Sequence, residues 1–450
     1  MKMKIKLKVI RDVFQALAPL VTFDSVMFVF AVMVLVCAFA WTPKKKVVFK
    51  KATITFLQWW DGEMRAGALQ KLVDDFEAEN PAIQVKLERR SKDDVFRYLV
   101  AETPPAGMPP RCDVAALDPY WVPLLVQKNL LYQLDAAFFE DARLAGGGAA
   151  GADGAEAGVA ETFALSGGYY AVPVARFPNF LFYNVTLLQN AGFDRPPKTR
   201  EEFYDMCKKI SAGKLGVYGF AVSGDVWTDC FPLIWQAGIN TPRLLAQSGA
   251  NGTGGANAIG EAGIGGITAD AFLGDRAVHQ TVAFLRQLNA ERVVLPYFAG
   301  FSEDEKIKAF AAGRVAMMSA PISAVSRLRA AGGAPQFNIT TIPAPGNYSG
   351  RPVFNCKAWF AGIPAAGEHI DSALIFLEFL MYKQREFAAA AGGIQTLREN
   401  RITPEMEVRD DLHTKASNLF DSGELIEDYY LFDDLDAAGG ALIDEVRRGQ

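Results

Sequence analysis

Residues 52–90 read ATITFLQWWDGEMRAGALQKLVDDFEAENPAIQVKLERR, and this stretch decides the fold class. ATITFLQWW has the apolar run of a buried strand, and GEMRAGALQKLVDDFEAENP has the spacing of an amphipathic helix that its proline ends. AIQVKLERR then predicts a second strand. The alternation returns at 111–134, where RCDVAALDPYW is followed by the predicted helix VPLLVQKNLLYQL. Strands that alternate with helices predict an α/β protein with a mostly parallel sheet.

The size and charge of the chain narrow the classes of protein that it can be. At 450 residues it exceeds the size at which a single hydrophobic core keeps growing, so we expect two domains. Its 46 basic and 51 acidic residues give a net charge of -5, and no basic stretch is interleaved with aromatic residues. A polyanion-binding surface needs the opposite balance, so nucleic acid is excluded as a partner.

The N-terminus has the pattern of an export signal. Basic residues in the first eleven positions are followed by an uncharged, largely apolar run at 25–43. Three outcomes stay open: cleavage after Ala40, a lipid on Cys37, or retention of 25–43 as a membrane anchor. We therefore predict an export signal or anchor with a basic tether at 1–51, and a periplasmic or extracytoplasmic protein.

Catalytic and metal-binding motifs are missing from the sequence. The five cysteines include no C-x-x-C pair, and the three histidines are far apart. Neither G-x-S-x-G nor H-E-x-x-H occurs. We predict no enzyme activity, no cofactor, no metal and at most one disulfide.

Two segments rich in glycine and alanine interrupt the predicted domains. Residues 144–160 and 248–266 have almost nothing to bury, and neither contains a phosphate-binding loop. We predict flexible surface insertions there.

Aromatic and polar side chains follow two of the predicted strands. Gln58, Trp59, Trp60 and Asp61 follow the first strand, and a second group that includes Asp118 follows another. Ligands of open α/β sheets bind at the carboxyl ends of strands. A tryptophan face suits the C–H side of a sugar, and carboxylates and amides suit its hydroxyls. One of the two consecutive tryptophans is expected to be structural, because neighbours on a strand point to opposite faces.

Five blocks in order carry a family resemblance. They are ITFLQWWDGE, GMPPRCDVAALDPYWVPLLVQKNLLYQLD, GGYYAVPVARFPNFLFYNVTLLQNAGFDRPPKTREEF, FAAGRVAMMSAP and DSALIFLEFLMYKQREFAAAAGG. Together they resemble the family of extracytoplasmic solute-binding proteins of carbohydrate ABC importers that includes the maltose-binding protein. The resemblance covers most of residues 52–450.

The resemblance implies a type II periplasmic-binding-protein fold with two lobes, each a mixed, mostly parallel sheet flanked by helices. Lobe 1 would comprise residues 52–174 and 358–410, and lobe 2 residues 175–357 and 411–450. It also implies a monomer that captures a carbohydrate between the lobes and delivers it to the membrane permease subunits of an ABC transporter.

Ligand-facing positions are carried over from the family by place in the matched blocks. They are Trp59, Trp60, Asp61, Asp118, Tyr120, Phe177, Asn179, Trp227, Ser319, Ile322 and Trp359. Ile322 stands where sugar-binding relatives often have an aromatic residue, which favours a short sugar.

Other readings stay open. A sugar phosphate such as glycerol phosphate would need basic groups in the cleft, for which Arg176 is a candidate. Ferric iron is often held by adjacent tyrosines, and the chain has Tyr169–Tyr170 and Tyr429–Tyr430. A membrane-tethered sensor and an enzyme on the same fold are further alternatives.

Overall fold

The computed structural model describes residues 52–135, 138, 164–165, 168–213, 215–239, 244, 267–296, 300, 302–394, 411–426 and 435–448. The predicted signal or membrane segment and both predicted insertions lie outside these residues. Over the described part of the chain, no helix combines the length and the apolar character needed to cross a membrane.

The first strand, helix and strand are confirmed. β1 (Ala52–Gln58) and β2 (Ile83–Arg89) pair in parallel, and α3 (Ala68–Glu79) connects them. The helix begins later than predicted, because the 3-10 turn η2 (Trp60–Gly62) and a left-handed Gly67 at φ 74° come first. The residues between β1 and α3 thus form a loop at the carboxyl end of β1.

The other strands extend the sheet. They are β3 (Val114–Leu117), β6 (Val172–Asn184), β7 (Tyr218–Ala221), β8 (Val315–Pro321), β9 (Phe337–Thr340), β10 (Val353–Gly362) and β11 (Glu424–Ile426), with a separate pair of β4 (Ala164–Leu165) and β5 (Gly168–Tyr169).

Within the described residues, one nine-stranded sheet runs in the order β2-β1-β3-β10-β6-β8-β7, with β9 beside β6 and β11 beside β10. β1 pairs in parallel with β2 and β3, whereas β10 is antiparallel to β3 and β6. The sheet is mixed, as predicted. It is also continuous through β6 and β10, whereas the sequence predicted one sheet in each lobe.

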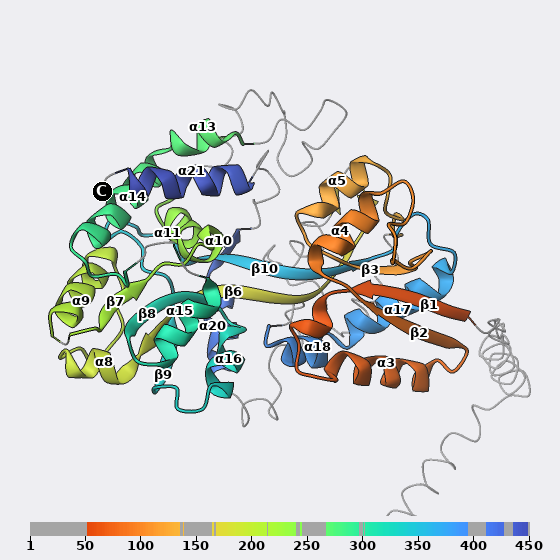
Figure 1. Cartoon of the computed structure of the whole chain (residues 1–450), viewed down its shortest axis with the longest axis horizontal. Helices are drawn as coiled ribbons and strands as arrows, with labels where there is room; N and C mark the ends of the chain where they lie inside the picture. Colours follow the sequence, from red (N-terminus) through yellow and green to blue (C-terminus); the bar gives the residue numbers. More distant parts are fainter. Residues whose placement is uncertain are drawn as a thin grey trace, which may run out of the picture. The chain divides into compact units, whose positions relative to one another are not determined.

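Buried apolar side chains form separate clusters at the two ends of β6 and β10. The first cluster includes Phe56, and the second and third include Phe220 and Phe310. We call the part built around the first cluster lobe 1 and the part built around the other two lobe 2. Figure 1 shows the two parts joined by β6 and β10.

Helices cover both lobes. Those of lobe 1 are α3, α4 (Lys92–Val100), α5 (Trp121–Gln127), α17 (Ile370–Tyr382) and α18 (Gln384–Ala391). Those of lobe 2 are α8 (Val185–Asn190), α9 (Arg200–Gly213), α10 (Val226–Asp229), α11 (Phe231–Gln236), α13 (Ala269–Leu273), α14 (Arg276–Ala290), α15 (Glu303–Ala311), α16 (Ala324–Ala330), α20 (Asp411–Asp421) and α21 (Leu435–Arg447). α5 is shorter than predicted, because Asn129 turns the chain at φ 54° and Leu131 then pairs with Pro364.

Three described segments pass between the lobes. β6 and β10 are two of them, and residues 391–394 are the third, since Ala391 belongs to the first cluster and Ile394 to the third. The backbones of Arg176 and Ile394 exchange two hydrogen bonds, at 3.0 and 2.8 Å. The third segment is therefore held against β6 at the crossing.

The four cysteines that the structure describes do not form disulfides with each other. Cys112, Cys207, Cys230 and Cys356 are free and buried. Burial raises the pKa of the Cys112 thiol to about 12, so it has little thiolate character at neutral pH.

Candidate ligand-binding site

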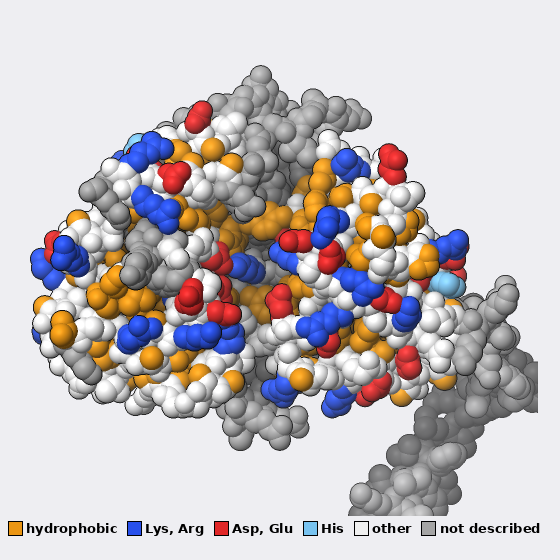
Figure 2. All heavy atoms as spheres, viewed as in Figure 1, with side chains coloured by type: hydrophobic (Ala, Val, Ile, Leu, Met, Phe, Trp, Pro, Cys, Tyr) orange, Lys and Arg blue, Asp and Glu red, His pale blue; other side chains and the backbone are white. Residues whose placement is uncertain are grey.

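β6 and β10 carry the floor of the candidate site where they cross between the lobes. Their register places Lys357 opposite Phe177. Because side chains alternate between the two faces of a strand, Asn179 of β6 and Asn355 and Trp359 of β10 lie on the same face as this pair. We call these five residues the crossing face. Figure 2 shows a hollow between the lobes, with apolar, basic and acidic side chains along it.

Aromatic rings gather at the lobe 1 end of the crossing face. Trp60 is fully buried and lies flat on Trp359, with ring centroids 5.5 Å apart and 11° between the planes. Phe177 packs on Trp359 at 4.8 Å, and Trp59 lies edge-on to Trp60 at 6.0 Å. The structure therefore brings four predicted site residues together in one buried group.

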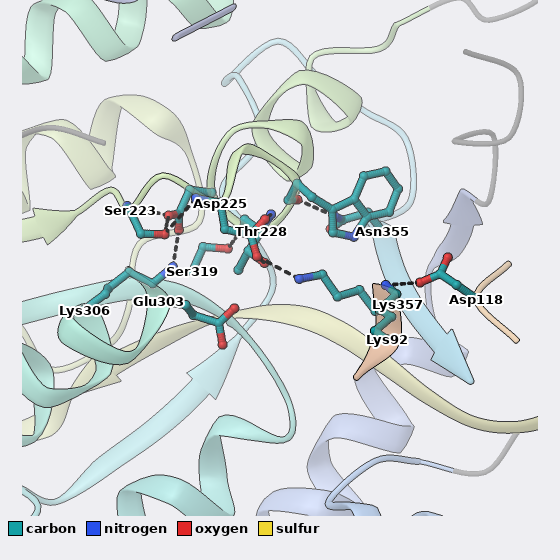
Figure 3. Close-up of polar contacts among 12 residues, drawn as sticks. Lys92, Asp118, Ser223, Asp225, Thr228, Glu303, Lys306, Ser319, Asn355 and Lys357 are labelled. Atoms are coloured by element: carbon teal, nitrogen blue, oxygen red, sulfur yellow. Dashed lines mark hydrogen bonds and ion pairs between the residues drawn. The ribbon is translucent and has the colours of Figure 1, made fainter. Parts of the chain in front are cut away.

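A short segment of lobe 2 lies against the other end of the crossing face. The amide of Asn355 donates to the carbonyl of Trp227 at 2.7 Å, and the Ser319 hydroxyl donates to the carbonyl of Thr228 at 2.5 Å. Figure 3 shows these contacts. The ring of Trp227 lies edge-on to Tyr120, which follows β3 of lobe 1, at 5.9 Å. Two predicted site residues thus meet where the lobes approach each other.

Lys357 extends from the crossing face to α10. Its ammonium group lies 2.7 Å from the carboxylate of Asp225, the N-cap of α10. Burial raises the pKa of Asp225, but Lys357 and the hydrogen bonds from Thr228 outweigh this effect and lower it to about 2. Burial lowers the pKa of Lys357, and Asp225 raises it more, so the pKa is raised overall. Both groups are therefore charged at neutral pH.

A second ion pair borders the site in lobe 1. The ammonium group of Lys92 pairs with the carboxylate of Asp118, which also accepts a hydrogen bond from the Tyr120 backbone at 3.0 Å. The same ammonium group lies 5.9 Å from the ring centre of Trp59 and 5.7 Å from that of Trp121. This end of the cleft accommodates a cation between aromatic rings and a carboxylate.

Two further carboxylates face these charges. Glu303, at the start of α15, pairs with Arg327 at 2.9 Å. Glu63 follows η2, and its side chain has no hydrogen-bond or ion-pair partner among the residues that the structure describes. Burial raises the pKa of Glu63, Lys92 and Lys357 lower it, and Glu303 raises it, with a net upward shift. Glu63 therefore interacts with charges of both lobes.

A buried ion pair holds α10 in place through Asp229, its last residue. Lys306 and Asp229 lie 2.5 Å apart, both fully buried, and Ser223 donates its backbone N–H and its hydroxyl to Asp229 at 2.6 Å each. Burial raises the pKa of Asp229 to about 6, although Lys306 and Ser223 lower it. This pair fixes the segment that carries Trp227.

Several buried polar atoms at the site have no partner among the described residues. Both amide atoms of Asn179 are in this state, as are Oδ1 of Asn355, Nε2 of Gln58 and Nε1 of Trp60. Buried polar groups are rarely left without a hydrogen bond. Their concentration at one place indicates a site that receives polar groups from a ligand or from ordered water.

Two further predicted residues make other contacts. Asp61 lies 3.6 Å from Arg89, which ends β2 opposite Gln58. Ile322 is fully buried in the third cluster, and its N–H donates to the carbonyl of Pro178 at 3.0 Å.

Sequence reasoning named Asp118 but missed the other charged residues of the site, which are Glu63, Lys92, Asp225, Glu303 and Lys357. One local signal was available, because Asn355 and Lys357 occupy alternate positions in the otherwise apolar strand VFNCKAWFAG. A lysine in a buried strand points to a specific partner.

The fold and the cleft define a two-lobed α/β binding protein. The family model for bacterial extracellular solute-binding proteins matches residues 71–405. The chain belongs to this family, which confirms the resemblance found in the sequence. It is a family of extracytoplasmic binding proteins and not of enzymes, as the sequence predicted.

Solved structures share the fold. The GacH receptor of Streptomyces glaucescens GLA.O, described unliganded and with acarbose, has 19% identity and a TM-score of 0.66, covering 89% of this chain and 94% of that one. Maltose-bound MalE3 of T. maritima has 18% identity and a TM-score of 0.63, with 88% and 99% covered. An ABC substrate-binding protein of Listeria monocytogenes in complex with cycloalternan has 14% identity and a TM-score of 0.63, with 89% and 95% covered.

Curated relatives match over a shorter stretch. Proteins of Brucella abortus (strain 2308) and Brucella suis biovar 1 (strain 1330), both named as binding proteins, are 26% identical over 184 residues, or 39% of this chain. The chain spans 40% of the length of these relatives in the match.

Proposed function

We propose that this protein is the substrate-binding component of an ABC importer, which captures a sugar or related polyol between its lobes and delivers it to the membrane permease. Family membership supports the general role. Structures with the same fold are described with acarbose, maltose and cycloalternan. The observation that carries the proposal is the meeting, on the crossing face, of aromatic rings with two buried amides. Both amide atoms of Asn179 and the carbonyl oxygen of Asn355 have no partner among the described residues.

The aromatic residues supply the apolar half of a sugar site. Trp60 is held between Trp359 and the core, so we assign it the structural role expected for one of the two consecutive tryptophans. Trp59 and Trp121 lie farther toward the charged end of the cleft, beside Lys92. A stacked sugar face of roughly 60 Å² would contribute about 1.5 kcal/mol, or around tenfold in affinity. Trp121, which is partly buried, is the more accessible of the two rings, because Trp59 is only 6% exposed.

The amides supply the polar half. Asn179 offers one acceptor and two N–H donors, and Asn355 keeps its carbonyl oxygen for a further donor. Neighbouring hydroxyls of a sugar present donors and acceptors at similar spacing. We propose that Asn179 and Asn355 bind such hydroxyls when the segment around α10 shifts on ligand binding.

We propose lobe boundaries at 174/175, 357/358 and 410/411, and closure of the lobes on the ligand. The core clusters support the boundary in β10, whereas Ala175 and Phe177 in the first cluster favour a later boundary in β6, and Ile394 in the third cluster favours an earlier third boundary. Open and closed arrangements of such proteins differ by a few kcal/mol, and a ligand that contacts both lobes favours the closed one. The ring contact between Tyr120, which follows β3 of lobe 1, and Trp227 of α10 in lobe 2 is expected to change when the lobes close.

The remaining assignments are also proposals. The outer surfaces of the lobes would dock the permease subunits, and the protein would act as a monomer outside the cytoplasmic membrane. Residues 25–43 or a lipid on Cys37 would hold it there. The membrane-tethered sensor remains a second proposal with no site observation in its favour.

Two alternative ligands find less support. A sugar phosphate needs basic groups that are open to it, whereas Lys92 and Lys357 both lie against carboxylates. Alternation along β6 puts Arg176 on the face opposite to Phe177. For ferric iron, no group of three or more His, Cys, Asp or Glu in the described ranges is placed to hold a metal ion. Tyr429–Tyr430 lie outside those ranges.

A thermal-shift screen of the full-length protein tests the proposal. The panel comprises maltose, raffinose, sorbitol, glycerol phosphate and ferric citrate. A ligand whose free concentration is a hundred times its dissociation constant adds about 2.7 kcal/mol to the free energy of unfolding. We expect this shift with a saccharide or polyol and no turnover of that ligand. If glycerol phosphate or ferric citrate were the only compound that stabilised the protein, the ligand would belong to that class and not to the sugars or polyols.

A further inference from the structure

Lys357 is the exposed residue of an otherwise buried strand. Every other residue of β10 is buried, whereas the Lys357 side chain is 43% exposed. It belongs to the crossing face and lies opposite Phe177 of β6, where both strands pass between the lobes. The exposed part of Lys357 therefore opens into the cleft.

The ammonium group of Lys357 has donors that no described residue uses. It donates one hydrogen bond, to Oδ2 of Asp225 at 2.7 Å, and makes no other hydrogen bond or ion pair with the residues that the structure describes. An ammonium group has three N–H donors and no acceptor. Two of its donors are therefore left for oxygen atoms in the cleft.

Asp225 is held in place at the start of α10. Its Oδ1 accepts the backbone N–H of Thr228 at 3.1 Å, and its Oδ2 accepts the Thr228 hydroxyl at 2.8 Å in addition to the Lys357 ammonium group. Figure 3 shows Lys357 reaching this carboxylate. A carboxylate oxygen accepts about two hydrogen bonds, so Oδ2 is already filled. The main effect of Asp225 is therefore to orient Lys357.

The pairing also cancels the charge of Lys357. A lone ammonium group in a cleft attracts carboxylates and phosphates, whereas an ammonium group 2.7 Å from a carboxylate presents no net charge. An anionic ligand at Lys357 would lie near Asp225 and be repelled by it, but a hydroxyl oxygen would not. Lys92, at the lobe 1 end of the cleft, is paired with Asp118 in the same way.

We infer that Lys357 donates hydrogen bonds to hydroxyl oxygens of the ligand, and that Asp225 excludes anionic sugars by neutralising Lys357. The inference rests on the proposed function and restricts the ligand class to uncharged sugars and polyols. Asp225 is a positioning residue, since it acts through Lys357. Asn179 of the same face has no partner for its amide atoms among the described residues, and it supplies further donors and an acceptor for neighbouring hydroxyls.

Matched sugars that differ in charge test the inference. Isothermal titration of the full-length protein at pH 7 would compare glucose with glucuronate and galactobiose with digalacturonate, in which ionised carboxylates replace hydroxymethyl groups. Maltose, raffinose and sorbitol complete the panel. We expect the wild-type protein to bind the neutral member of a pair about tenfold or more tightly than the anionic member.

Asp225→Asn should raise the affinity for the uronates relative to the neutral sugars by about tenfold or more, because it leaves Lys357 charged and without its acid. Asp225→Ser keeps a hydroxyl oxygen to cap α10 and should give the same shift, so it replaces the asparagine variant if that variant does not fold.

Lys357→Met should weaken binding of the neutral sugars by about tenfold or more, because it removes the donors. In the double variant Asp225→Asn/Lys357→Met, the shift towards uronates should disappear. A merely structural role of Asp225 would not depend on Lys357 in this way.

Glu291→Gln is the matched control. Glu291 pairs with Lys208 of α9 at 2.8 Å, and the two side chains are 33% and 57% exposed. The change takes the acid from a lysine of similar exposure that is not on the crossing face, so it should keep the wild-type ratio of affinities. Thermal unfolding checks that each variant folds.

Each other outcome is decisive. A wild-type preference for uronates, an affinity for uronates that Asp225→Asn leaves unchanged, or a shift that survives in the double variant overturns the inference and leaves the proposed function standing. The same holds if Lys357→Met binds the neutral sugars within about twofold of the wild type. Binding of no sugar or polyol in the panel by the wild type counts against both.

Discussion

Lys357 on β10 lies 2.7 Å from Asp225, the N-cap of α10, so the strand that crosses between the lobes is tied by charge to the segment that carries Trp227. The side chains are 43% and 25% exposed, and the pair is therefore open to water from the cleft. Such a pair is weaker than a buried one and can rearrange when a ligand enters.

Asp225→Asn should lower the free energy of unfolding at pH 7 by at most about 2 kcal/mol, because the folded state holds the pKa of Asp225 at about 2 against the ordinary 3.8. A lowered pKa gives stability that is present above the unfolded pKa and is lost as the pH falls through the folded one. In urea titrations, the difference between wild type and variant should shrink between about pH 4 and pH 2. A difference that stays constant over this range would contradict the assignment.

Lys306→Met should lower the free energy of unfolding by roughly 3–5 kcal/mol, because it leaves the buried carboxylate of Asp229 without its cation. The folded pKa of Asp229 is raised to about 6, above the unfolded value, so its ionisation costs stability as the pH rises from about 4 to 6. Because Lys306 lowers this pKa in the wild type, the variant should recover stability as the pH falls from above 6 towards 4. The double variant Lys306→Met/Asp229→Asn should recover part of the loss at pH 7, and a failure to do so would argue against charge burial as the cause.

Trp60→Ala should cost about 3–5 kcal/mol of unfolding free energy in urea titrations, because the ring is fully buried and stacked on Trp359. Trp121→Ala is a milder change, since Trp121 is only partly buried. If Trp60→Ala costs less than about 1 kcal/mol, the buried aromatic group is not part of the core.

Asn179→Leu should change the free energy of unfolding by less than about 1 kcal/mol, because the side chain loses no hydrogen bond to the described residues. Asn355→Leu on the neighbouring strand is the matched control. It removes the bond to the Trp227 carbonyl at 2.7 Å and should cost about 1–3 kcal/mol. Equal costs in urea titrations would show that Asn179 has a bonded partner after all.

Periodicity and position made part of this structure predictable. The strand, helix and strand of residues 52–90 were visible because burial on one face imposes a repeat on the sequence. The start of α3 was not, since Gly62 and Gly67 interrupt a pattern that otherwise continues. Trp60 and Trp359 were both named as site residues, but their stacking depends on the pairing of distant strands.

The charged half of the site was not predictable in the same way. Lys92 at the start of a helix has the pattern of a solvated surface residue, and only the fold brings it to Asp118. Glu63 lies within a matched block, but its lack of a partner depends on where Lys92 and Lys357 find theirs. Charged residues of a site leave no periodic pattern in the sequence, because their role depends on which residues lie next to them in the folded structure.

The central claim is that a polyhydroxylated solute binds on the crossing face. Isothermal titration of the saccharide or polyol selected by the thermal-shift screen, into wild-type protein and Asn179→Leu, tests it most directly. The account predicts one site per chain in the wild type and a loss of about tenfold or more in affinity in the variant, with its unfolding free energy nearly unchanged. Unchanged affinity in a folded Asn179→Leu variant would contradict it.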